Sequence, residues 1–122
     1  MAEAYIVDAV RTAGGRRGGR LAGIHPVDLA AATLDALVAR SGIDPASIED
    51  VIMGCVSQGG QQANQIGRNA VLASKLLPQS VPAVTIDRQC GSSPLARRTG
   101  SPAVMIRTGG QSSPPEPIAA AA

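Results

Sequence analysis

The feature that most constrains the fold is a continuous uncharged run, Val51–Val56. Its length suits one β-strand, and it does not alternate between apolar and polar residues, so both faces of the strand are expected to be buried. A strand of this kind belongs inside a sheet that helices cover. The run therefore favours an α/β structure over an open antiparallel sheet.

Two helices are predicted on either side of this run. The first spans Pro26 to Ser41-Gly42, because proline suits the first helical position and glycine the end. The second runs from about Asn64 to Leu77, where Pro78 ends it. In both segments the apolar residues recur at helical spacing on one face.

Two further strands are predicted, over Tyr5–Val10 and Val81–Ile86, and a Gly/Arg-rich loop over Gly14–Gly23. The order strand, helix, strand, helix, strand implies parallel pairing through right-handed helical crossovers. The predicted fold class is α/β.

One thiol follows a predicted strand end. Cys90 comes after Ile86, and the chain then turns through Gly91–Ser93 toward an expected helix. Open α/β sheets place ligand sites beyond the carboxyl ends of their strands. A helix N-terminus favours the reactive thiolate, and its N–H groups can hold an oxyanion. A thiol beside small residues also fits ordinary packing, so both interpretations stay open here.

Composition sets further limits. A chain of 122 residues forms one domain at most, and Tyr5 is its only aromatic residue, so the core must be built from aliphatic side chains. Two cysteines without an apolar leader indicate reduced thiols in the cytoplasm. No run approaches the ~20 apolar residues of a membrane span. A cytoplasmic protein is expected.

The composition changes after Ser93. Residues 94–122 are rich in Pro, Gly and Ala, and Arg97-Arg98 and Pro102 fall where a buried helix would otherwise continue. Such composition is typical of disordered segments. We therefore predict a folded domain over residues 1–93 and an irregular C-terminal tail over 94–122.

Four motifs resemble the N-terminal part of the thiolases, which are acyl-CoA acetyltransferases. They are Ala4–Thr12, Gly18–Leu21, Val51–Val56 and Gln89–Ser93. The resemblance implies a mixed sheet with helices on both faces, a homo-oligomer, coenzyme A thioesters as substrates, and no permanently bound cofactor. It places acyl-thioester formation in lipid metabolism, with a weak preference for fatty acid or steroid breakdown. It carries the acyl-accepting role onto Cys90 and not onto Cys55, which falls in a predicted strand.

The resemblance also implies missing parts. Thiolases are much longer and use a downstream Gly-His-Pro histidine, a second catalytic cysteine and a loop domain that grips coenzyme A. His25 precedes Pro26 at a helix start, where a capping or surface role is expected. We therefore expect a gene truncated or frameshifted beyond Cys90, and a nearly inactive chain. The alternative is a non-catalytic remnant or subunit-binding fragment.

Other functional classes are less well supported. The Gly14–Arg20 loop could cradle a phosphate or contact RNA, but it lacks the Lys-Ser/Thr ending of a phosphate loop and has no interleaved aromatics. Residues 1–93 carry equal numbers of basic and acidic side chains. One histidine and two separated cysteines do not form a zinc cluster. We expect no nucleic acid and no metal; the residues that would bind coenzyme A cannot be assigned.

Overall fold

A computed structural model describes residues 5–92 and 104–108 of the chain. Within this part neither helix has the length and apolar composition that a membrane span needs. The elements are α1 Pro26–Ser41, the 3-10 turn Pro45–Ser47, β1 Ile48–Gly54, the 3-10 turn Gly60–Gln62, α2 Ile66–Ala73, β2 Ala83–Ile86 and β3 Val104–Thr108.

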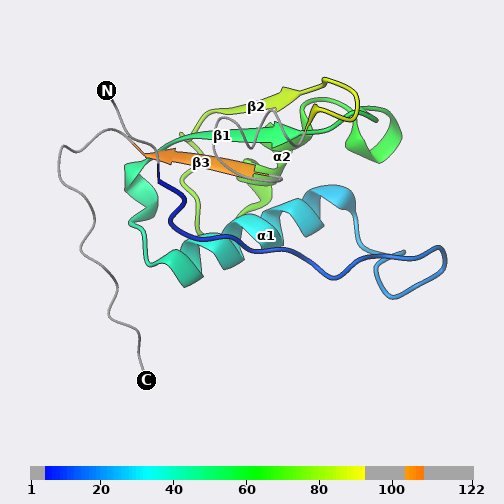
Figure 1. The fold of residues 1–122 in the computed structure, drawn as a ribbon, viewed down its shortest axis with the longest axis horizontal. Coiled ribbons are helices and arrows are strands. Elements are labelled where there is room, and N and C mark those ends of the chain that lie inside the picture. The colour runs from blue at the N-terminus through cyan, green and yellow to red at the C-terminus, as the bar shows by residue number, and fades with distance from the viewer. Residues whose placement is uncertain (1–4, 93–103, 109–122) are drawn as a thin grey trace.

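The described strands form a three-stranded mixed sheet in the order β2-β1-β3 (Figure 1). β1 is parallel to β2, with Val51 beside Ala83, and antiparallel to β3, with Val51 beside Ile106. The uncharged run thus supplies much of the central strand, as its sequence predicts. The α/β fold class and the parallel pairing of β1 with β2 are confirmed.

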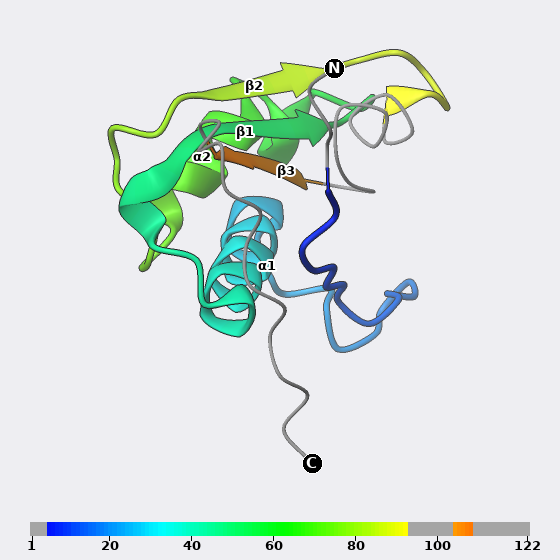
Figure 2. The ribbon, with the colours of Figure 1, turned by 60° about the vertical axis from the view of Figure 1, so that its left-hand side comes forward.

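Both described helices lie on one face of this sheet (Figure 2). Val51 and Met53 point from β1 into a core shared with Leu34 of α1 and Val71 of α2. The opposite face of the sheet is more open, and Val84 there is 41% exposed. Helices are expected on both faces of the sheet. In the described part of the chain they cover one face.

The first helix agrees with its prediction at both ends. His25 lies just before α1 in an extended conformation, and its Nδ1 accepts a hydrogen bond from the Val27 N–H at 3.2 Å. Gly42 ends the helix with φ +67°, and its N–H donates to the Val38 carbonyl. These are an N-cap and a left-handed C-cap. The capping role expected for His25 is confirmed.

The second helix is shorter than predicted. It ends at Ala73 because Ser74 leaves the helical conformation, and the Ser74 hydroxyl donates to Asp35 Oδ1 at 2.5 Å. The same carboxylate oxygen accepts from the N–H groups of Lys75 and Leu76 at 3.1 and 3.2 Å. Leu77 enters the core from this turn. The spacing of apolar residues predicts a helix as far as Leu77 because Leu77 is buried in the core. It is buried from a turn, however, and not from the helix.

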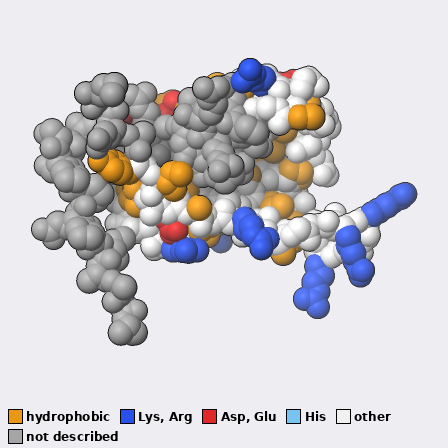
Figure 3. Space-filling view, in the orientation of Figure 1, with side chains coloured by type: hydrophobic (Ala, Val, Ile, Leu, Met, Phe, Trp, Pro, Cys, Tyr) orange, Lys and Arg blue, Asp and Glu red, His pale blue; other side chains and the backbone are white. Residues whose placement is uncertain are grey.

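The Gly/Arg-rich loop is confirmed as a loop. The Gly19 N–H donates to the Arg16 carbonyl at 2.9 Å, and Gly18 has φ +67°. Arg16, Arg17 and Arg20 are exposed, and Figure 3 shows Lys and Arg side chains extending into solvent at the end of the molecule where the loop lies.

The predicted first strand is wrong. Residues 5–10 have no strand assignment, and Tyr5, Ile6 and Val7 are 66%, 72% and 51% exposed. An apolar segment becomes a strand only where a neighbouring edge offers hydrogen bonds. Both edges of the central strand β1 are taken, by β2 and β3, and residues 5–10 do not extend the sheet at either outer strand.

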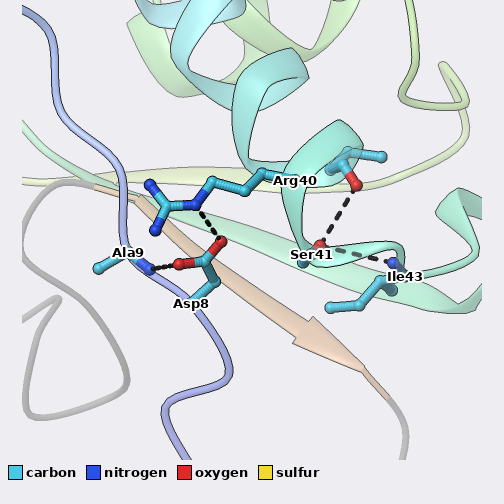
Figure 4. Close-up of polar contacts among 6 residues, drawn as sticks. Asp8, Ala9, Arg40, Ser41 and Ile43 are labelled. Atoms are coloured by element: carbon cyan, nitrogen blue, oxygen red, sulfur yellow. Dashed lines mark hydrogen bonds and ion pairs between the residues drawn. The ribbon is translucent and has the colours of Figure 1, made fainter. Parts of the chain in front are cut away.

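This segment is instead tied to α1 by an ion pair. Asp8 Oδ2 lies 3.0 Å from Arg40 Nε, while Asp8 Oδ1 accepts from the Ala9 N–H at 2.7 Å (Figure 4). The Arg40 side chain is 65% exposed, while the Asp8 side chain is 18% exposed. Solvent screens a pair with an exposed partner, so the contact contributes little free energy, about 0–1 kcal/mol.

β3 lies inside the segment predicted to be irregular. Val104–Thr108 pairs with β1, so the prediction is wrong for these residues. Val104-Met105-Ile106 has the composition of a strand, and the open edge of β1 provides its hydrogen bonds. The other residues of 94–122 lie outside the described part of the chain. Their disorder and the domain boundary at Ser93 stay predictions.

The contact between α2 and the sheet can be tested at Gly67. A Cβ atom there would lie 3.1 Å from the Val84 carbonyl oxygen and 3.3 Å from Met53 Cβ. Although alanine favours helices, we expect Gly67→Ala to lower the free energy of unfolding by about 1–3 kcal/mol through overpacking. Urea unfolding followed by circular dichroism measures the change. Gly59→Ala is the matched control, since nothing lies within 4 Å of its Cβ position. Equal stabilities would contradict the close packing.

The turn after α2 can be tested at Asp35. Asp35→Ala removes the acceptor of the Ser74 hydroxyl and of the Lys75 and Leu76 N–H groups, so the free energy of unfolding should fall by about 1–3 kcal/mol. Asp28→Ala, an exposed acid in the first turn of α1, should cost less than about 1 kcal/mol. The same urea titration compares them, and a larger loss for Asp28→Ala would refute the capping role of Asp35.

Candidate active site

Two loops meet at the carboxyl ends of the parallel strands. β1 ends at Gly54 beside Ile86, the last residue of β2. The pairing continues by one residue, since the Cys55 N–H donates to the Ile86 carbonyl at 2.9 Å. Each loop carries one of the two cysteines. This edge is where parallel α/β sheets present ligand-binding residues.

The loop after β2 is a tight turn that exposes Cys90. The Gly91 N–H donates to the Arg88 carbonyl at 2.9 Å, and the Ser92 N–H donates to the Gln89 carbonyl at 3.0 Å. Gln89 has φ +50°, the left-handed conformation that non-glycine residues rarely adopt. Cys90 follows it and is exposed. The turn therefore presents this thiol to solvent beyond the strand end.

Side chains on either side of Cys90 hold the turn. The Ser92 side chain is buried at 3% exposure, and its hydroxyl accepts from the Arg88 N–H at 2.8 Å and donates to the Gln89 carbonyl at 2.7 Å. Asp87 Oδ1 accepts from the Gln89 N–H at 3.0 Å. The backbone of Gln89 is thus bonded on both sides of its Cα atom.

Gly91 allows the turn to close. A Cβ atom at this position would lie 3.1 Å from the Arg88 carbonyl oxygen, closer than ordinary packing. Glycine directly after Cys90 is therefore explained by the lack of space for a side chain at this position. Ser92 has a helical assignment. The residues after it lie outside the described part of the chain, so the helix expected there stays a prediction.

Cys55 has a different environment. It lies directly after β1 and not within it, which corrects its predicted position by one residue. Its side chain is half-buried, with Sγ 3.8 Å from the Ser57 carbonyl oxygen and 3.9 Å from Gln62 Oε1. A thiol is a weak donor, so these contacts orient Cys55 without activating it.

His25 is not brought to Cys90 by any hydrogen bond of the described residues. Its ring is engaged at the start of α1, and it is the only histidine of the chain. The expectation that His25 does not activate the nucleophile stays a prediction. The sequence motif Gln89–Ser93 contains Gln89 and Ser92, but the left-handed backbone of Gln89 and the burial of Ser92 arise only in the folded turn.

The family profile for the N-terminal domain of thiolase matches residues 4–111. The match includes all four sequence motifs and the Cys90 turn. The match also extends beyond Ser93 and covers β3. Similarity to the family therefore continues into residues 94–111, although their composition differs from that of residues 1–93.

Characterised relatives agree with this profile. The chain is 56% identical over 108 residues to the steroid 3-ketoacyl-CoA thiolase FadA6 of Mycobacterium tuberculosis, covering 88% of this chain and 26% of that protein. It is 45% identical over 94 residues to the beta-ketoadipyl-CoA thiolase of Acinetobacter baylyi, covering 76% of this chain and 23% of that protein. The chain thus spans about a quarter of the length of these relatives.

A solved structure shares the fold. The acetyl-CoA acetyltransferase of Bacillus anthracis superposes with a TM-score of 0.60 at 35% identity, over 70% of this chain and 21% of that one. Together with the profile match over most of the sequence, this similarity covers the sheet, its helices and the turn that carries the exposed thiol. The chain therefore belongs to the thiolase family and corresponds to part of its N-terminal domain.

Proposed function

We propose that Cys90 accepts the acyl group in an acyl-CoA C-acetyltransferase reaction. The observation that carries this proposal is the exposed Cys90 thiol on a tight turn at the carboxyl ends of β1 and β2. Cys55 is a poorer candidate because its thiol is half-buried and already in contact with Ser57 and Gln62. Family membership supplies the acyltransferase class.

The chemistry is transfer of an acyl group from a coenzyme A substrate to the Cys90 sulfur. The Cys90 thiolate attacks the carbonyl carbon of acetyl-CoA or of a 3-ketoacyl-CoA, and a new carbon–sulfur bond forms. With acetyl-CoA, the bond from that carbon to the sulfur of coenzyme A breaks, and the departing sulfur takes up the proton that the Cys90 thiol released. With a 3-ketoacyl-CoA, attack at the keto carbon breaks the carbon–carbon bond instead, and the departing acetyl-CoA carbanion takes up the proton. The acyl group then resides on Cys90. Coenzyme A acts as part of the substrate and not as a resident cofactor.

The rate of this step in the isolated chain should be low. An activated cysteine needs a base within hydrogen-bond reach. The only histidine caps α1, and no hydrogen bond within residues 5–92 links it to Cys90. We therefore propose that the chain alone retains little activity.

The names of the relatives support a class of substrate. The proteins that the chain resembles are named for 3-ketoacyl-CoA, steroid 3-ketoacyl-CoA and beta-ketoadipyl-CoA substrates. We propose the degradative direction within lipid metabolism for the protein to which this sequence belongs. A cytoplasmic location, consistent with two free thiols, and a homo-oligomeric state complete the proposal.

A non-catalytic role in subunit binding is the second candidate. It is favoured by the apolar side chains that the described residues leave exposed, among them Ile6 at 72% and Val84 at 41%. Ile6 and Val7 are consecutive in the chain, and neighbouring exposed apolar side chains mark a site of protein contact. This role would not require Cys90 to react with acyl-CoA.

Acetyl transfer to the isolated chain separates the two candidates. Purified chain incubated with millimolar acetyl-CoA should slowly gain one acetyl group on Cys90, removable by hydroxylamine because it is a thioester. Intact-mass and peptide-mapping mass spectrometry measure the gain. Cys90→Ala should abolish it, while the matched control Cys55→Ala should retain it. Absence of the acetyl group from Cys90, or equal acetylation of both cysteines, would favour the non-catalytic role.

A further inference from the structure

We propose that Ser92 is a positioning residue for Cys90, acting through the left-handed backbone of Gln89. The inference rests on the proposed function of Cys90 and deepens it. The Ser92 hydroxyl does not touch the Cys90 thiol in the bonds described above; it fixes the two residues that precede Cys90. The direction in which the thiol leaves the turn then depends on this buried hydroxyl.

The Ser92 hydroxyl acts as both donor and acceptor. It donates to the Gln89 carbonyl at 2.7 Å and accepts from the Arg88 N–H at 2.8 Å. Because Ser92 is 3% exposed, water cannot easily replace either bond. Replacement by alanine would leave a backbone N–H group without its partner in a nearly closed site.

Gln89 needs this support because of its conformation. A glutamine at φ +50° is strained by its own Cβ atom, and such residues persist where their surroundings hold them. Asp87 Oδ1 binds the Gln89 N–H, while the Ser92 hydroxyl and N–H both bind the Gln89 carbonyl. Both peptide groups of Gln89 are therefore held, and relaxation of its φ angle requires these bonds to break.

Cys90 inherits its orientation from this arrangement. It lies between Gln89 and Gly91, and the Gly91 N–H is bonded to the Arg88 carbonyl at 2.9 Å. The Cα–Cβ bond of Cys90 is therefore directed by a backbone fixed on both sides. If Gln89 relaxed to negative φ, the thiol would point elsewhere while remaining exposed. Acyl transfer depends on such alignment, whereas reaction with a small alkylating reagent depends mainly on access.

The test compares two reactions at Cys90 in the complete chain. Ser92→Ala should lower the rate of Cys90 acetylation by acetyl-CoA by about tenfold or more, and change its alkylation by iodoacetamide by less than about threefold. Ser92→Thr, which keeps the hydroxyl, should restore most of the acetylation rate. Peptide-mapping mass spectrometry measures both rates at each cysteine. Cys55 alkylation reports the integrity of the fold, because that thiol is half-buried.

A second variant connects the effect to Gln89. Glycine adopts positive φ without strain, so the acetylation loss caused by Ser92→Ala should be smaller when Gln89→Gly is already present. In the unsubstituted chain, the one-bond Cα–Hα coupling of Gln89, measured by NMR, should show the left-handed conformation. In Ser92→Ala it should shift toward the value for negative φ.

The outcomes separate this inference from the proposed function. If the unsubstituted chain is alkylated but not acetylated at Cys90, the proposed function fails for this chain, and the Gln89 coupling alone decides the role of Ser92. Unchanged acetylation and unchanged coupling in Ser92→Ala would overturn the inference. So would a general rise in Cys55 alkylation without rescue by Ser92→Thr, since this result would show that Ser92 only stabilises the fold.

Discussion

The packing of β1 between its two neighbouring strands and the two helices is the constraint on which the rest of the structure depends. Val51 is fully buried and Met53 nearly so, and both lie in the core with residues of α1 and α2. Gly67 brings α2 so close to β1 and β2 that a single added carbon would contact backbone and side chain at once. Burial of these aliphatic side chains drives the packing, in a chain that has one tyrosine and no Phe or Trp.

The candidate active site is a consequence of that parallel pair. β1 and β2 end side by side, so the loops that follow them lie at the same edge of the sheet. The two cysteines are nevertheless unlike. The turn after β2 closes through hydrogen bonds of Ser92 and Asp87 and exposes Cys90, whereas the loop after β1 folds Gln62 over Cys55. Backbone geometry, more than distance along the chain, distinguishes the exposed Cys90 thiol from the half-buried Cys55 thiol.

Membership of the thiolase family indicates acyl transfer as the chemistry to consider for this site. The chain spans about a quarter of the length of its relatives. A sheet with helices on one described face and partly exposed apolar side chains on the other fits a part of a larger assembly. The acyl-accepting step needs only a positioned thiol and a thioester. Its rate depends on a base and on binding of coenzyme A, and the one histidine of the sequence caps α1.

The sequence by itself determined the elements whose signals are local. The cap residues His25 and Gly42 set the ends of α1, and the uncharged run set the central strand. Four motifs together, one of them around Cys90, pointed to the family. Tertiary structure decided the features that depend on contacts between segments distant in the sequence. Residues 5–10 do not pair with the central strand, because β2 and β3 take both of its edges. Leu77 is buried from a turn whose N–H groups are bound by Asp35 of another helix. The left-handed Gln89 and the buried Ser92 hydroxyl likewise follow from hydrogen bonds that close only when the turn has folded, and no pattern of residue types encodes them directly.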